Sequence, residues 1–245
     1  MCYIRGMLNL LDLTLDTPAQ NLALDEALLD EADQNPNAQT LRFWESRPYF
    51  VVLGYSNHCN REAFYSRATA DNVPVLRRAS GGGAVLQGPG CLNYSLILQI
   101  SQYPELRNIH DTNCFIMKKI QNMFLQIDPD IEFKGLTDLS RHDLKFSGNA
   151  QRRKRKAVLF HGTFLYKFKI AQIEKYLKPP SSEPRYRDNR AHKKFVTNIS
   201  INPHWIKKSL AKDWEATNVT QDYPKELVEQ LVAERYSQDT WNKKY

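Results

Sequence analysis

The stretch from Arg77 to Gly90, which reads RRASGGGAVLQGPG, contains five of the ten glycines in this chain of 245 residues. Short runs typical of strands flank it, Pro74–Leu76 before it and Leu92–Leu98 after it. Three consecutive glycines between strands cost conformational entropy and contribute no packing, so the chain is expected to need bare backbone there. Either a ligand approaches this loop closely, or the segment is a bulged hairpin with solvated arginines. In the first case Arg77 and Arg78 would suit a phosphate or a carboxylate.

The composition fits one large globular domain or two small ones, because 42% of the residues are hydrophobic. No run approaches the roughly 20 apolar residues that span a bilayer, so no membrane partner is expected. The N-terminal apolar run is broken by Asp12 and Asp16 and lacks the features of a secretory signal. We therefore expect a buried first strand and a cytoplasmic protein, with its four cysteines reduced because they form no CxxC pair.

Capping signals and periodicity predict the main helices and strands. Thr17, Pro18 and Gln20 predict the start of a helix with a capping box, and we expect Asp25 and Glu26 to lie on its solvated face. The other predicted elements are strands at Thr40–Trp44 and Tyr49–Gly54, helices at Arg61–Asn72 and Asp111–Gln126, and two short helices between Pro203 and Trp241.

A second polar stretch, Ile131 to Tyr166, is predicted to form a hairpin with the basic segment Arg152–Lys156 at its tip. The expected opposing pairs are Gln151 with Ala157, Lys145 with Thr163, and Ser147 with His161. The polar side chains would then share one face of the sheet, as a site or as a surface ladder. The net charge of +7 permits an acidic partner. No aromatic residues interleave the basic tip, so nucleic acid is not expected to bind there.

Three segments together resemble the lipoate–protein ligase and octanoyltransferase group, the biotin/lipoate A/B protein ligase family. They are RRASGGGAVLQGPG, NLALDEALL near the N-terminus and KFSGNAQRRKRKAVLFHGTFL in the middle, and the match runs from about Leu8 to Ile199. The resemblance is to the catalytic domain of a lipoate–protein ligase A-like protein. It implies an α+β fold of the class II synthetase or biotin/lipoate ligase type, with a mixed, largely antiparallel sheet flanked by helices. Residues 1–245 would form this single domain, with a C-terminal helical segment at 200–245 and no separate accessory domain.

The resemblance also implies a set of site residues. The family's catalytic lysine corresponds to Lys145, in the pattern K-x-S-G-x-A that precedes H-G-T. A cation held beside developing negative charge stabilises the transition state of acyl transfer. Asp138 matches an aspartate that the ligases place near the nucleotide and its magnesium, although the ligases usually carry Asn where this chain has Thr137. The residues expected to bind the substrate and its adenylate are Arg77, Arg78, Ser80, Gly81, Gly82, Gly83, Ala84, Gly148, Ala150, His161, Gly162 and Thr163. Of these, His161 is expected to shape the pocket and not to move protons.

Three functions are compatible with the resemblance. The first is an ATP-dependent lipoate–protein ligase, which uses ATP and Mg²⁺ to form lipoyl-adenylate and then lipoylates a lysine of an acceptor domain. The second is an octanoyl or lipoyl transferase acting through an enzyme thioester, and the third is a non-catalytic binding protein. The family's transferases carry a nucleophilic cysteine either shortly before K-x-x-G-x-A or after the HG motif, and this chain has cysteine at neither place. This favours the ligase, although Gly88-Pro89-Gly90 resembles the loop of one transferase group.

The expected partner is the lipoyl-acceptor domain of a carrier protein. Such domains are acidic in this family, so the basic tip Arg152–Lys156 would orient them. Many bacterial ligases carry a further C-terminal accessory domain, and this chain stops at Tyr245. Either a separate accessory chain supplies that part or the enzyme works without it. The apolar tail pocket would suit lipoate and octanoate alike.

Overall fold

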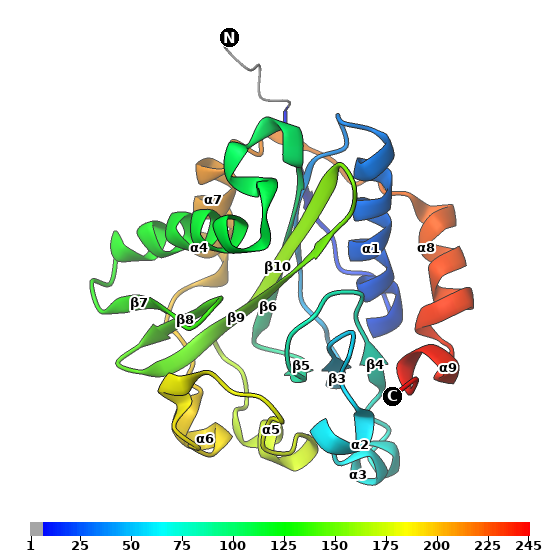
Figure 1. The fold of residues 1–245 in the computed structure, drawn as a ribbon, viewed down its shortest axis with the longest axis vertical. Coiled ribbons are helices and arrows are strands. Elements are labelled where there is room, and N and C mark those ends of the chain that lie inside the picture. The colour runs from blue at the N-terminus through cyan, green and yellow to red at the C-terminus, as the bar shows by residue number, and fades with distance from the viewer. Residues whose placement is uncertain (1–6) are drawn as a thin grey trace.

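The structure is a computed structural model, and it describes residues 7–245. An eight-stranded mixed sheet has helices on both of its faces, and a three-stranded sheet lies at one end of the molecule (Figure 1). The strands of the large sheet follow one another in the order β11 (Asn218–Val219), β1 (Asn9–Asp12), β2 (Thr40–Trp44), β6 (Cys91–Gln99), β10 (Ala157–Leu165), β9 (Leu144–Arg153), β8 (Asp138–Arg141) and β7 (Ile131–Lys134). Neighbours β11, β1 and β2 are parallel and the other pairs are antiparallel. The expected α+β class is confirmed.

The small sheet carries the glycine-rich loop. Its strands, in spatial order, are β4 (Val75–Arg77), β3 (Phe50–Leu53) and β5 (Val85–Gln87). The loop is the connection from β4 to β5, and β6 follows directly. Helices α2 (Cys59–Glu62), α3 (Tyr65–Ala70) and α5 (Ala171–Tyr176) contribute to the separate apolar cluster around this sheet. The strands predicted on both sides of the glycines are therefore confirmed.

Two apolar layers hold the large sheet between helices. Helix α1 (Pro18–Gln34), with α8 (Lys225–Leu231) outside it, covers one face, and α4 (Ile109–Leu125) and α7 (Pro203–Asp213) cover the other (Figure 1). The remaining helical turns are η1 (Ile100–Gln102), η2 (Pro104–Arg107), η3 (Arg185–Arg187), α6 (His192–Phe195), the π-helical turn η4 (Val232–Tyr236) and α9 (Asp239–Asn242). Within residues 7–245, none of the helices has both the length and the apolar character needed to cross a membrane.

Helix α1 begins as predicted but is buried more completely than predicted. The Thr17 hydroxyl accepts a hydrogen bond from the backbone N–H of Gln20. The Gln20 side chain accepts one from the backbone N–H of Thr17, which completes the capping box. The expectation that Asp25 and Glu26 face solvent is wrong, because both side chains are buried. The sheet packs against one side of α1 while α8 and η4 pack against the other, so the helix has little solvated surface.

Most other predicted elements are found, with one difference in length. The helix expected at 111–126 is α4, the two C-terminal helices are α7 and α8, and the first strand is β1. Residues 1–6, which the predicted first strand included, lie outside the described residues. The single helix expected at Arg61–Asn72 is instead the two short helices α2 and α3, separated at Ala63 and Phe64. Ala63 leaves the helical path because it pairs with Leu177 in a β-bridge.

The hairpin of β9 and β10 forms, but the predicted register is wrong. The observed pairs are Thr163 with Gly148, His161 with Ala150, and Phe160 with Gln151. Strand β9 continues through Arg153, two residues into the basic segment, and the turn covers only residues 154–156. This tighter turn shifts the register by three residues. Since alternate side chains point to opposite faces, Ser147 lies on the other face from His161.

Candidate active site

The α1-facing side of the large sheet collects most of the expected site residues. Residues directly opposite each other in an antiparallel ladder point to the same face. One row across the sheet is Arg42 (β2), Ser95 (β6), His161 (β10) and Ala150 (β9). The adjacent row on the same face is Trp44, Asn93, Thr163, Gly148 and Asp138. Five predicted residues therefore share one surface, namely His161, Ala150, Thr163, Gly148 and Asp138.

Lys145 reaches this surface because the ladder between β8 and β9 is irregular. A register shift between Leu139 and Ser140 places Ser140 opposite Lys145. The lysine ammonium then lies 2.7 Å from Oδ1 of Asp138. A Cβ atom added to Gly148 would stand 2.8 Å from both Cε and Nζ of Lys145. Glycine in the K-x-S-G pattern thus leaves the space that the lysine side chain occupies.

Asp138 has partners on both carboxylate oxygens. Besides the ammonium on Oδ1, the hydroxyl of Tyr186 donates to Oδ2 at 2.8 Å. Burial, together with the neighbouring Asp138 carboxylate, raises the pKa of Tyr186, so this hydroxyl stays protonated and donates. Tyr186 belongs to η3 in the Pro/Ser-rich segment after β10, which the sequence did not indicate as part of a site.

A magnesium ion held jointly with a nucleotide fits this donor set. The described residues contain no cluster of three His, Cys, Asp or Glu side chains that could hold a metal ion by themselves. Mg²⁺ in nucleotide sites typically takes one or two carboxylates and completes its shell with phosphate oxygens and water. The single carboxylate of Asp138, beside Lys145, is suited to that arrangement.

The glycine-rich loop is held from within by Arg78. Its guanidinium donates to the carbonyl oxygens of Gly81 and Gly83 and to the hydroxyl of Ser80. Burial lowers the pKa of Arg78 to about 10, so the group remains charged at neutral pH. In this structure the Arg78 side chain bonds to the loop itself, and its expected contact with a ligand stays a prediction.

The glycines of the loop differ in what they do. Gly82 has φ = +91°, a left-handed conformation that glycine adopts without strain, and its α-carbon faces Ala150 of the sheet. A Cβ atom on Gly81 or on Gly83 would meet nothing within 4 Å. Open space therefore adjoins the loop at Gly81 and Gly83, where backbone amides would be accessible to a ligand.

Arg77 and Gly162 lie away from this group. The Arg77 side chain is fully buried and donates to five carbonyl oxygens, those of Gly54, Tyr55, Asn57, Trp241 and Asn242. It ties the base of the loop to α9 and does not face the open side. Gly162 faces the α4 side of the sheet, where an added Cβ would lie 1.6 Å from Oδ1 of Asn149. Ala84 packs partly against the cluster around the small sheet.

A buried polar chain, which the sequence did not predict, lies beneath the loop. Nε2 of His161 is 2.6 Å from Oγ of Ser80, and Nδ1 of His161 is 3.6 Å from Oδ2 of Asp25. Arg42 donates to Oδ1 of Asp25 at 2.6 Å. One sequence signal could have found it: Arg42 stands inside the apolar strand TLRFW, where a charge needs a buried partner.

Two of the three free thiols in the described part of the chain are buried and poorly suited to act as nucleophiles. Cys59, Cys91 and Cys114 are free, and Cys2 lies outside the described residues. Cys91 is fully buried below the loop and donates to Oε1 of Gln87, and burial raises the pKa of its thiol. Burial also raises the pKa of Cys59. Neither thiol is present as a thiolate at neutral pH.

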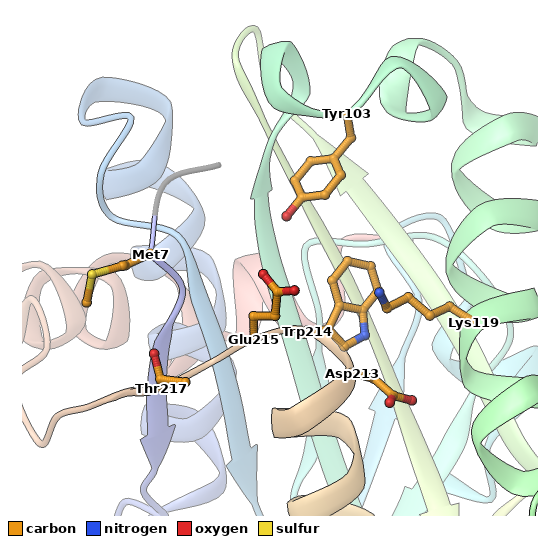
Figure 2. Close-up of a pocket in the computed structure, with 7 residues that line it drawn as sticks. All are labelled: Met7, Tyr103, Lys119, Asp213, Trp214, Glu215 and Thr217. Atoms are coloured by element: carbon orange, nitrogen blue, oxygen red, sulfur yellow. The ribbon is translucent and has the colours of Figure 1, made fainter. Parts of the chain in front are cut away.

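A separate cavity lies far from these residues. It has a volume of about 180 Å³ and is lined by Met7, Tyr103, Lys119, Asp213, Trp214, Glu215 and Thr217 (Figure 2). It includes none of the expected site residues. A much smaller void of about 10 Å³, close to the size of one water molecule, adjoins Ser80, His161 and Asp25.

Comparison with known proteins agrees with the fold. The model of the lipoyl protein ligase A/B catalytic domain matches residues 17–211. The chain therefore belongs to the lipoyl protein ligase A/B catalytic domain family. Its similarity to individual members is modest and extends to two kinds of enzyme.

Two curated relatives represent these kinds. The chain is 29% identical over 182 residues to the protein of Mycoplasma pneumoniae named "Probable lipoate-protein ligase A", covering 74% of this chain and 52% of that protein. It is 26% identical over 261 residues to the octanoyltransferase LipM of an Exiguobacterium species, covering 92% of this chain and 94% of LipM. The chain thus spans about half the length of the first relative and nearly all of the second.

Solved structures share the fold. A bipartite lipoate protein ligase from Thermoplasma acidophilum, described with its E2 lipoyl domain, has a TM-score of 0.78 at 23% identity, covering 98% of this chain and 97% of that one. A lipoate-protein ligase A bound with ATP has a TM-score of 0.77 at 20% identity, covering 98% and 99%. At these identities the similarity establishes the fold.

Proposed function

We propose that this chain is the catalytic domain of an ATP-dependent lipoate–protein ligase. In the first half-reaction a lipoate carboxylate oxygen attacks the α-phosphorus of ATP, which forms lipoyl-adenylate and releases pyrophosphate. In the second, the amine of an acceptor lysine attacks the acyl carbonyl, AMP leaves and the amine loses a proton. The observation that carries this proposal is the Lys145 ammonium, held between Asp138 and the bare α-carbon of Gly148 on the surface that the glycine loop covers.

The roles of the side chains follow from their positions. Lys145 would stabilise the negative charge that develops on the phosphate and on the acyl oxygen, because a compact cation fixed at the reacting atoms needs no reorganisation. The backbone amides of Gly81–Gly83 would donate to the adenylate. Asp138 would hold Mg²⁺ together with the nucleotide, and the ion would neutralise phosphate charge when bound. The ATP-bound structure of a ligase with the same fold supports the choice of nucleotide.

The acyl acceptor is proposed to be an acidic lipoyl domain. Arg152, Arg155 and Lys156 are exposed at the tip of the β9–β10 hairpin and would attract such a domain. The bipartite enzyme of T. acidophilum, described with an E2 lipoyl domain, supports this partner. It also makes a separate accessory chain a second candidate partner, since this chain matches only about half of its M. pneumoniae relative.

An octanoyltransferase is the second candidate. Its support is the LipM relative, which matches along 94% of its own length, and the Gly88-Pro89-Gly90 sequence. Against it, a thioester mechanism needs a thiolate near the site, and the thiols of Cys59 and Cys91 are buried with raised pKa values. Cys114 lies on α4, which covers the other face of the sheet from Lys145.

The two candidates make opposite demands on ATP. The test incubates the purified chain with a lipoyl-acceptor domain and supplies either lipoate, ATP and Mg²⁺ or an octanoylated carrier protein without ATP. We expect acylation of the acceptor lysine only in the first mixture. Acylation in the second mixture alone would establish the transferase. If neither mixture reacts, release of pyrophosphate from ATP in the presence of lipoate is measured. Release would indicate that an accessory chain is missing for the transfer step, and no release would indicate a wrong assignment.

A further inference from the structure

Arg42 and Asp25 form a buried ion pair below the glycine loop. The Arg42 guanidinium has no exposed surface, and all five of its N–H groups are engaged. They donate to the carbonyl oxygens of Leu13 and Asn21, to Oδ1 of Asn21 and to Oδ1 of Asp25. Burial acts to raise the pKa of Asp25, but Arg42 and His161 together hold the pKa below its ordinary value, so the carboxylate is ionised.

The second oxygen of Asp25 is directed to His161. Within residues 7–245, Oδ2 of Asp25 is buried and accepts no hydrogen bond, and Nδ1 of His161 lies 3.6 Å from it. A carboxylate facing one ring nitrogen favours the tautomer that carries its proton there. A proton on Nδ1 leaves Nε2 as the acceptor that the 2.6 Å contact with the Ser80 hydroxyl requires.

The hydroxyl of Ser80 completes the chain. Its oxygen accepts a hydrogen bond from Nε of Arg78 at 3.0 Å. Among the described residues, the only acceptor paired with its proton is Nε2 of His161, at 2.6 Å. The hydrogen bonds then run in one direction from Arg78 through Ser80 to His161, and the imidazole faces the Asp25 carboxylate at 3.6 Å. Ser80 keeps its acceptor only while Nε2 of His161 carries no proton.

We propose that Asp25 and His161 are positioning residues for acyl-substrate binding, which hold the glycine loop in its ligand-binding conformation through Ser80. Their action is indirect, since Ser80 and Arg78 transmit it to the carbonyl oxygens of Gly81 and Gly83. The inference rests on the proposed function only in taking lipoate as the ligand that the loop binds.

The order Ser80–His161–Asp25 is also that of a nucleophilic triad, but the surroundings differ. Ser80 is only 1% exposed, and Arg78 donates to its oxygen, which withdraws electron density from it. A serine nucleophile needs an exposed oxygen that can reach the acyl carbon. The geometry therefore favours positioning over attack, and the two roles leave different products.

Protonation of His161 would break the chain at Ser80. A proton on Nε2 would face the hydroxyl proton, and Ser80 would lose its acceptor. The charged and titratable groups around His161 are Asp25 and Glu26 of α1, Arg42 of β2, Arg78 of the loop, and Arg235 and Tyr236 of η4. Glu26 is already bonded to Arg235 and Tyr236, so Asp25 is the carboxylate that faces the imidazole.

Two substitutions of His161 separate its two contacts. In His161→Gln the side-chain amide reaches the place of Nε2 and keeps an acceptor for Ser80, whereas His161→Asn keeps a donor near Nδ1 and loses Ser80. Calorimetry with lipoate and no ATP measures binding alone. We expect about tenfold weaker binding for the Asn variant and less than threefold for the Gln variant, because one hydrogen bond at the loop is lost in only one of them.

Retained lipoate binding in the Gln variant, together with weaker binding in the Asn variant, is an effect that a merely structural role would not produce. Loss of pyrophosphate release with intact lipoate binding would contradict the proposed function but not this inference.

A measurement on the wild-type protein avoids any effect of substitution on folding. Nitrogen-15 spectra of the labelled histidines at about pH 7.5 should show a proton on Nδ1 of His161 and none on Nε2, assigned by the signal absent from His161→Gln. A proton on Nε2 at that pH would overturn the proposal. So would equal weakening in the Gln and Asn variants, failure of the wild-type protein to bind lipoate or octanoate, or an acyl ester on Ser80 in intact mass spectra.

Discussion

The ammonium of Lys145 lies 2.8 Å from the point where a Cβ atom on Gly148 would stand. The two residues face each other across three positions of one strand because the irregular pairing of β8 with β9 turns the lysine back over the sheet. Contacts this short are not seen for real Cβ atoms, so any side chain at position 148 must move the lysine. The geometry of the proposed catalytic cation thus depends on a glycine that touches no substrate.

Gly148→Ala should therefore lower activity by displacing Lys145. The lysine end is flexible, so we expect the melting temperature to change little, while turnover falls about tenfold or more. Lys145→Ala should cost about 10²–10³ in rate, as expected for a lost electrostatic contact at the reacting atoms. Initial rates of pyrophosphate release measure both effects.

The double variant provides the control for this pair. If Gly148 acts through Lys145, adding Gly148→Ala to Lys145→Ala should cost nothing further. Lys207→Ala, which removes an ion pair with Asp12 away from this surface, should leave the rate unchanged. Additive losses in the double variant would contradict the link between the two residues.

Gly82 and Gly81 offer a matched pair in the loop. Gly82→Ala forces an L-residue to φ = +91° and places its Cβ 2.8 Å from Nη2 of Arg78, whereas Gly81→Ala adds the same methyl group to open space. We expect Gly82→Ala to weaken binding of a non-hydrolysable lipoyl-adenylate analogue about tenfold or more, since the conformation alone costs roughly 1–2 kcal/mol. In Gly81→Ala only contact with the ligand itself can matter. Equal calorimetric affinities for Gly82→Ala and the wild-type protein would indicate that the loop has a purely structural role.

The sequence predicted the elements of this fold better than their environments. The capping box at Thr17 and the apolar periodicity of α4 are local signals, and both helices begin within two residues of their predicted starts. Asp25 is buried against Arg42 and His161 of the sheet, and Glu26 is buried against Arg235 and Tyr236, about 200 positions away in sequence. Local sequence patterns do not reveal such contacts, so the expectation that Asp25 and Glu26 lie on a solvated face of α1 is wrong.

The grouping of several candidate residues on one surface was predictable from the resemblance, but their geometry was not. The resemblance brought Lys145, Asp138, Thr163 and His161 together correctly, although the register behind that expectation was off by three residues. Local polarity could not show how far β9 extends into the basic segment. Tyr186 was missed because it reaches Asp138 from a Pro/Ser-rich segment 48 residues away, through a single hydrogen bond.

The Asp25–Arg42 pair should make stability depend on pH. The pKa of Asp25 is lowered in the folded protein, so ionised Asp25 adds stability above its unfolded pKa of about 4, and this stability is lost as pH falls through the folded value. Asp25→Asn should lower the free energy of unfolding by about 3 kcal/mol at pH 7, because it leaves Arg42 charged and buried without a counter-charge. Urea unfolding should show the difference narrowing below about pH 4. Asp222→Asn, at an exposed position, should have no such effect.

The basic hairpin tip can be tested without disturbing the site. Arg153 and Lys154 have structural partners, in Leu106 and Thr112 for the first and Asp30 for the second, whereas Arg155 and Lys156 are exposed. Reversing Arg155 and Lys156 to Glu should slow association with an acidic acceptor domain several-fold and flatten its salt dependence. Pyrophosphate release without acceptor should not change.

Reversal of Lys208 and Lys212 on α7 gives the matched control. Both residues are exposed on α7, which covers the face of the large sheet opposite to α1. Their reversal changes the net charge by the same amount as the reversal of Arg155 and Lys156, but at a distant place. Stopped-flow rates for the two double variants separate a local docking effect from a general loss of positive charge. Equal slowing in both would contradict docking at the tip.

The most direct test of the account is the state of the acyl group on the enzyme before any acceptor is present. With lipoate, ATP and Mg²⁺, the chain should release one pyrophosphate per site and retain lipoyl-adenylate that denaturation frees, with Lys145→Ala strongly impaired. Intact mass spectra should show unmodified protein. The contradicting result is an acyl group bound covalently to the protein after incubation with an octanoylated carrier and no ATP, lost in a cysteine variant such as Cys91→Ser.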